Sequence, residues 1–217
     1  MSDISPTIQP LGETALVLSV GAELAAQRRL WAAWHVLEHR LPQVEWVLGM
    51  GNLTAHFDPL ATPSRVVIRA LEGAWTHSAG VELMPGQIIT LPVRYGGEYG
   101  PDLPVVAEHA GLTPREVAEA HAAGDYVVYC LGFLPGFAYL GGLDPRITAP
   151  RRADPRLAVP AGSVAIGGSQ TGIYPMASPG GWQLIGHTGA ALFDPYREIP
   201  GLLGPGDTVR FVIEDIA

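Results

Sequence analysis

The sequence predicts an α+β protein in two parts, an N-terminal unit that mixes helices with strands and a C-terminal unit built mainly of short strands. Two observations carry this prediction. Apolar residues in the first 84 positions alternate between helical and strand spacing. From residue 85 onward, short apolar pieces alternate with turns rich in glycine and proline, as in an all-β barrel or sandwich. We therefore expect one domain over residues 1–84 and a second over residues 85–217.

The N-terminal unit is predicted to follow the order β-α-β-β-α-β. Leu30, Trp34, Leu37 and Leu41 are spaced to form one buried stripe on a helix. Gly49 to Asn52 is a typical hairpin turn between two short apolar runs. We expect strands over 14–20, 44–48, 53–57 and 81–84 and helices over 23–40 and 63–75. This order indicates a small ferredoxin-like unit.

The C-terminal unit is predicted to begin with a strand and two helices before the short strands take over. Thr113 is a suitable N-cap for the second helix, with Pro114 in the first turn and Glu116 completing a capping box. We expect strands over 88–95, 126–131, 164–166, 182–185, 191–193 and 209–213 and helices over 104–110 and 114–123.

Composition and charge exclude several classes of function. The net charge of -8 and the pI near 5.3 argue against a nucleic-acid partner, which would need a basic surface. No apolar run approaches the roughly 18 residues that a membrane span needs. The single cysteine, Cys130, cannot form an internal disulfide, and no basic residue precedes Arg28, so no secretory signal is expected. We expect a cytoplasmic protein without a membrane partner.

All 13 basic residues are arginine, which limits the chemistry available to the chain. Without lysine there is no Schiff base, no lysine general base and no P-loop. Carboxylate or phosphate groups must therefore be bound by arginine, by backbone N–H groups or by a partner chain. Arg146, Arg151, Arg152 and Arg156 form a cluster that reads equally well as an anion clamp or as solvated loop charges.

Three glycine-rich segments, over residues 132–143, 159–175 and 178–188, are the best candidates for a binding site. Glycines let backbone N–H groups approach a ligand, and the neutral polar side chains among them supply hydrogen bonds. Each glycine taken alone could simply turn a corner of the barrel. The three segments together favour a composite or substrate-binding site, with these candidate residues: Phe133, Pro135, Gly136, Arg151, Arg152, Gln170, Thr171, Tyr174, Gly180, Gly181, Trp182 and His187.

Other motifs in the chain carry less weight, and they single out no catalytic residue. His35, Glu38 and His39 match an H-x-x-E-H zinc pattern, but solvated helix histidines are the better reading, so we expect no metal. Cys130, at the end of an apolar strand, is expected to be an inert buried thiol. His187 could work with a nearby aspartate in proton transfer, although nothing in the sequence places the two together.

Several long motifs closely resemble one known family. They are residues 95–103, 132–140, 150–152, 159–166 and 178–182. They resemble the KipI family, also called allophanate hydrolase subunit 1, which includes the B subunits of bacterial 5-oxoprolinases. The resemblance implies a small α+β N-terminal domain followed by a cyclophilin-like β-barrel.

The resemblance also implies a function and partners. The leading expectation is the B subunit of an ATP-dependent 5-oxoprolinase complex, inactive alone, which opens 5-oxoproline to L-glutamate with an A subunit and a homologous, KipA-like C subunit. ATP is the implied cofactor, bound mainly by a partner. Two alternatives stay open: a KipI-type inhibitor of a sensor histidine kinase, and a carboxyltransferase-type protein acting on urea or another small amide. His187 stands where the family is expected to carry arginine, which weakens any shared catalytic role for it.

Overall fold

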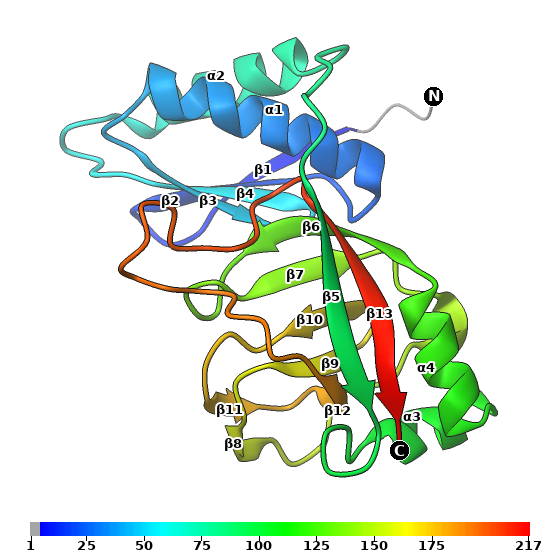
Figure 1. Cartoon of the computed structure of the whole chain (residues 1–217). Helices are drawn as coiled ribbons and strands as arrows, with labels where there is room; N and C mark the ends of the chain where they lie inside the picture. The colour runs from blue at the N-terminus through cyan, green and yellow to red at the C-terminus, as the bar shows by residue number, and fades with distance from the viewer. Residues whose placement is uncertain (1–4) are drawn as a thin grey trace. The chain divides into compact units, whose positions relative to one another are not determined.

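The computed structural model describes residues 5–217, which divide into two compact units (Figure 1). The first unit ends at Pro85 and the second spans Gly86–Ala217. None of the described helices combines the length and the apolar character that crossing a membrane requires.

The N-terminal unit is an antiparallel sheet in the order β1-β2-β4-β3, with both of its helices on one face (Figure 1). Leu30 and Leu37 of α1 and Val67 and Leu71 of α2 are fully buried. The predicted apolar stripe is therefore confirmed at Leu30 and Leu37, while Trp34 and Leu41 are half-buried. The elements are β1 (Thr7–Pro10), β2 (Ala15–Ser19), α1 (Leu24–Arg40), β3 (Glu45–Gly49), β4 (Asn52–His56) and α2 (Ser64–His77).

The strand predicted over residues 81–84 does not form, and β1 occupies the sheet edge beside β2. Val81 and Met84 are exposed and have no apolar surface to cover, whereas Thr7 to Pro10 pair with β2 along their whole length. The residues of β1 carry little strand signal, since the segment is short and mostly polar and ends in a proline. Proline is tolerated at a sheet edge, where its missing N–H is not needed. The ferredoxin-like assignment is therefore not confirmed.

The C-terminal unit is a closed barrel of seven strands in the order β10-β7-β6-β13-β5-β12-β9. Two further strands, β8 and β11, pair outside the barrel. The elements are β5 (Ile88–Tyr95), α3 (Leu103–Ala110), α4 (Pro114–Ala122), β6 (Asp125–Leu131), β7 (Ala138–Gly141), η1 (Pro145–Ile147), β8 (Arg156–Val159), β9 (Ser163–Gly167), β10 (Gln170–Ile173), β11 (Ser178–Gly180), β12 (Gln183–His187) and β13 (Thr208–Ile216).

The sequence predicted β5, α3, α4, β6, β9 and β12 to within two residues and β13 except for its last three residues. It did not predict β7, η1, β8, β10 or β11. The capping box at Thr113 and Glu116 is present as predicted. Residues 191–193 were predicted as a strand but form none: Phe193 makes only an isolated bridge to Gly201. This short apolar run lies in the long connection to β13, where Leu192 is buried without joining the sheet.

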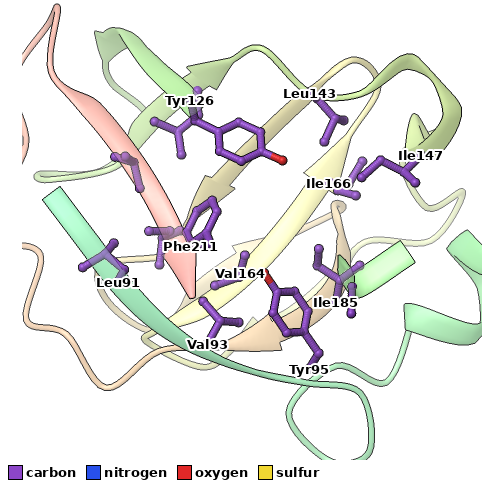
Figure 2. Close-up of a cluster of buried hydrophobic side chains, with 14 of the residues drawn as sticks. Leu91, Val93, Tyr95, Tyr126, Leu143, Ile147, Val164, Ile166, Ile185 and Phe211 are labelled. Atoms are coloured by element: carbon purple, nitrogen blue, oxygen red, sulfur yellow. The ribbon is translucent and has the colours of Figure 1, made fainter. Parts of the chain in front are cut away.

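The barrel interior holds both apolar side chains and one polar chain of hydrogen bonds. Figure 2 shows Tyr95, Tyr126 and Phe211 facing one another in this core, which β5, β6 and β13 help to enclose. Fully buried His121 from α4 lies between them, with its Nδ1 2.8 Å from the Tyr95 hydroxyl and its Nε2 2.8 Å from the Thr171 hydroxyl. The interior is therefore filled, and a ligand site must lie at its surface.

Candidate functional site

A cavity of about 240 Å³ lies on the C-terminal unit, where the three glycine-rich segments meet. The loop before β7, the loop before β8, the end of β10 and the β11–β12 segment all contribute to it. Its lining residues are Phe133, Phe137, Tyr139, Arg151, Pro155, Tyr174, Pro179, Gly180, Gly181 and Trp182.

Four aromatic rings form the wall of this cavity around Phe137. The Phe137 ring lies 5.0 Å from Tyr139, 5.3 Å from Tyr174 and 5.6 Å from Trp182, each pair edge to face. Phe137, Tyr174 and Trp182 are buried. Edge-to-face packing of this kind fixes each ring, so the wall is apolar and preformed.

Gly180 is required at the cavity because of Tyr174. A Cβ atom at this position would overlap the Tyr174 hydroxyl oxygen, so no larger residue fits beside that ring. Burial raises the pKa of the Tyr174 phenol, while the Trp182 backbone and the Arg151 charge act in the opposite direction. Burial also raises the pKa of Tyr139. Both phenols therefore stay protonated at neutral pH and can act as hydrogen-bond donors.

Phe133 stands at the rim of the cavity in a strained backbone conformation. Its φ is 65°, and among the described residues it alone has a positive φ without being glycine. The Leu134 N–H donates to the Gly132 carbonyl at 2.7 Å, which closes a tight γ-turn around Phe133. Phe133 is 58% exposed, and its ring meets Phe137 and Tyr174 edge to face. Such strain is typical of residues that are held in place for function.

Arg151 is the one cation among the described residues that line the cavity, and no carboxylate of residues 5–217 pairs with it. Its guanidinium carbon lies 5.7 Å from the centre of the Trp182 ring. Within the part of the chain that the structure describes, Arg151 forms no ion pair. It is exposed at the cavity, so it is available to an anionic ligand.

Arg152 does not line the cavity, and its guanidinium forms an ion pair with a buried carboxylate. Its Nη1 lies 3.1 Å from Asp102, which is 3% exposed and also receives two hydrogen bonds from Arg156 at 2.7 and 2.8 Å. The prediction that Arg152 binds ligand is therefore not supported by its position. Asp102 lies fifty residues earlier in the chain, and no spacing rule in the sequence could pair the two.

Thr171 lies inside the barrel, where it cannot reach a ligand in the cavity. Its side chain is fully buried and donates to the Ala165 carbonyl at 2.9 Å, so it accepts the Nε2–H of His121. Gln170 begins the same strand, is half-buried and is not part of the lining. Strand alternation decides this outcome, since neighbouring residues on a strand face opposite sides.

The remaining candidates, Pro135, Gly136 and His187, are not among the residues that line the cavity. Pro135 and Gly136 form the turn behind Phe133, and Gly136, with φ of 82°, packs against Phe193. His187 lies at the end of β12, where its Nε2 donates to the Ala161 carbonyl at 2.9 Å. Six of the twelve predicted residues thus line the cavity: Phe133, Arg151, Tyr174, Gly180, Gly181 and Trp182.

Sequence reasoning missed four lining residues, Phe137, Tyr139, Pro155 and Pro179. Phe137 and Tyr139 lie inside the first glycine-rich segment, and their aromatic character was a usable signal.

Cys130 is buried with its thiol pKa raised to about 11, which confirms an inert thiol. No group of three or more potential metal ligands occurs among the described residues. The His39 ring bonds to the His35 backbone carbonyl, and the His35 ring packs beside Trp34.

Three similarities to known proteins agree with this architecture. Residues 6–203 match the family described as the carboxyltransferase domain, subdomain C and D. The chain is 50% identical over 207 residues to the B subunit of 5-oxoprolinase from Escherichia coli O157:H7, covering 93% of each protein. It is 38% identical to the crystal structure of TTHA0988, with a TM-score of 0.76, over 97% of this chain but 40% of that one.

A protein of lower sequence identity shares the same fold. The urea carboxylase of Kluyveromyces lactis superposes with a TM-score of 0.79 over 98% of this chain, at 22% identity. This chain spans 22% of that protein. At this level of identity the likeness concerns the fold alone.

Proposed function

The chain belongs to the family of carboxyltransferase domains, subdomains C and D, that includes the B subunits of 5-oxoprolinases, and on this basis we propose that it is the B subunit of an ATP-dependent 5-oxoprolinase. It works in the cytoplasm with an A subunit and a homologous C subunit, and the complex opens 5-oxoproline to L-glutamate. The family supports the overall assignment, and the cavity supports the choice of substrate.

The observation that carries the proposal is Arg151, which has no ion-pair partner in the described part of the chain and lies beside a small aromatic wall. 5-Oxoproline is a flat five-membered lactam with one carboxylate. The guanidinium of Arg151 would bind that carboxylate, and the lactam ring would pack against Trp182 and Tyr174. A cavity of about 240 Å³ suits a ligand of this size. Urea, which has no carboxylate, would leave Arg151 without a partner.

The lining supports a subunit that positions the substrate and is inactive alone. Its only side chains with ionisable groups are Arg151, Tyr139 and Tyr174. Both phenols have raised pKa values, so neither is a base at neutral pH. An arginine stays protonated in proteins, so it cannot act as a base either. The general base and the remaining contacts to the reacting amide must come from a partner chain. This chain contributes orientation and the exclusion of water from one side.

The cavity does not suit ATP. A nucleoside triphosphate needs several cations or a row of backbone N–H groups around its phosphates, and the lining offers one arginine and no lysine. We place ATP on a partner protein of the complex.

The test is the release of glutamate from 5-oxoproline, coupled to ATP hydrolysis, by this chain alone and after mixing with its C and A subunits. We expect activity only in the full mixture, and none when urea replaces 5-oxoproline. Turnover of urea, or no turnover of 5-oxoproline by a complex shown to assemble, would contradict the proposal.

A further inference from the structure

We propose that Asp102 is a positioning residue that holds Arg151 in its ligand-binding place, an inference that rests on the proposed function. Asp102 does not touch the cavity. It is joined to the segment that carries Arg151, residues 150–156, through two arginines of that segment.

Asp102 precedes α3 at the N-cap position, where an aspartate usually accepts a hydrogen bond from its own helix. Its side chain makes no such bond. The carboxylate is directed instead at the Leu184 N–H, 2.7 Å away, and at the guanidinium groups of Arg152 and Arg156. A buried carboxylate that accepts four hydrogen bonds from three residues is firmly held, so it can act as a fixed anchor for mobile arginine side chains.

The segment is anchored on both sides of Arg151. Before it, the Pro150 carbonyl accepts a hydrogen bond from Gln183 at 2.9 Å. After it, the Arg152 N–H donates to the Gly181 carbonyl at 2.7 Å, and the Arg152 guanidinium meets Asp102. The Arg151 side chain itself is in contact with the Trp182 ring and, among residues 5–217, with no carboxylate. Its position over Trp182 therefore depends on these neighbours.

Asp102 is the part of this arrangement with the largest electrostatic effect. Arg152 and Arg156 are partly buried, with side chains 32% and 24% exposed, and Asp102 is the carboxylate that pairs with each. Without it, two like charges would remain close together in a partly desolvated place and would move toward solvent. The backbone between Pro150 and Arg156 would move with them, and Arg151 would lose its place beside the ring.

The variant that tests this is Asp102→Asn, which keeps the shape of the side chain and removes its charge. The control is Asp125→Asn, which removes an exposed carboxylate bound to Arg210 by two hydrogen bonds of 2.6 and 3.1 Å, away from the segment. Both variants are assayed for 5-oxoproline turnover in the complete complex, with thermal unfolding as the check on folding.

We expect Asp102→Asn to raise KM for 5-oxoproline by roughly tenfold, with kcat within about twofold of the wild type, because the binding group is displaced while the reacting groups are not. Asp125→Asn should leave both constants unchanged. A variant that merely unfolds in part would lower the apparent kcat and leave KM unchanged. That pattern for Asp102→Asn, or no change in either constant, would overturn the proposal.

A second readout does not depend on activity. Trypsin cleaves after arginine, so brief digestion of the folded chain reports how mobile residues 150–156 are. We expect cleavage after Arg151 and Arg152 to become several times faster in Asp102→Asn, with cleavage after Arg115 unchanged. Equal rates in the variant and the wild type would overturn the anchoring role. If instead the wild-type complex does not open 5-oxoproline, the proposed function fails, and the digestion still decides whether Asp102 holds the segment.

Discussion

Phe133 shows how a single residue can be kept at a cavity at the expense of stability. A φ of 65° is unfavourable for any residue with a Cβ atom by about 1–2 kcal/mol, and glycine is free of this penalty. The rest of the loop, including the turn through Gly136, holds the residue there. The exposed ring is the feature that this arrangement preserves.

We predict that Phe133→Gly is more stable than Phe133→Ala by about 1 kcal/mol, the reverse of the usual order, because both variants lack the ring and only alanine keeps the strain. Urea denaturation of the two variants measures the difference. Leu134→Ala and Leu134→Gly are the matched control, since Leu134 has a negative φ and alanine should be the more stable there. Alanine being the more stable at position 133 as well would show that the turn is not strained.

His121 is a second residue whose role follows from its surroundings. Because Thr171 donates to Ala165, it must accept from the Nε2–H of His121, which leaves Nδ1 to accept from the Tyr95 hydroxyl. The imidazole is therefore neutral, with its pKa lowered to about 3 by burial. In the unfolded chain a histidine has its ordinary pKa of about 6.5.

This difference predicts the sign of a pH effect. Between pH 6.5 and about 3 the unfolded state binds a proton at this site that the folded state does not. The contribution of His121 to stability therefore decreases as the pH is lowered, by up to about 1.4 kcal/mol per pH unit. The free energy of unfolding of His121→Gln should therefore approach that of the wild type as the pH falls from about 7 to about 4. Denaturation at several pH values measures this gap. A constant gap would show that His121 does not titrate as described.

At the scale of elements, the same hydrogen bonds join α4 to three barrel strands. His121 belongs to α4, Tyr95 to β5, Thr171 to β10 and Ala165 to β9. Their role is structural, because Thr171 faces the interior while the cavity lies outside it.

We predict that Thr171→Val lowers the free energy of unfolding by about 1–3 kcal/mol, because it leaves the buried His121 N–H and Ala165 carbonyl without their partner. KM for 5-oxoproline in the assembled complex should not change. Thr90→Val, on the exposed side of β5, is the control and should alter stability by less than about 0.5 kcal/mol. A raised KM with unchanged stability would return Thr171 to the ligand site.

The elements that the sequence predicted well are those specified by interactions between residues close together in the chain. The capping box at Thr113, the hairpin turn at Gly51 and the apolar stripe of α1 each depend on residues close together in the chain. The edge strand β1 was missed because its place is set by pairing with β2 and not by its own residues. The strand predicted over 81–84 failed for the complementary reason, since it has no partner among the described strands.

The site was predictable to a similar extent. The three glycine-rich segments do meet at one cavity, and of the four aromatic residues in its wall the sequence named Tyr174 and Trp182 but not Phe137 or Tyr139. The sequence could not separate Arg151 from Arg152, because that distinction depends on Asp102, far away in the chain. Nor could it place Thr171, whose direction follows from the register of β10 against β9.

At the scale of the whole molecule, the chain is one part of a larger system. It covers 93% of a protein named as a subunit and 40% of the longer chain TTHA0988. Its cavity has a wall and one cation, and its lining has no base or nucleophile that is active at neutral pH. These features agree with a subunit that positions a substrate for chemistry completed by other chains.

The most direct test of the proposed role of Arg151, binding the carboxylate of 5-oxoproline, is the KM of the complete complex carrying Arg151→Ala. We predict a rise of about 10- to 100-fold, the loss of one charged hydrogen-bonded contact. Arg146→Ala is the matched control, because Arg146 is exposed and paired with Asp144, and it should leave KM unchanged. An Arg151→Ala complex with the wild-type KM would contradict this role.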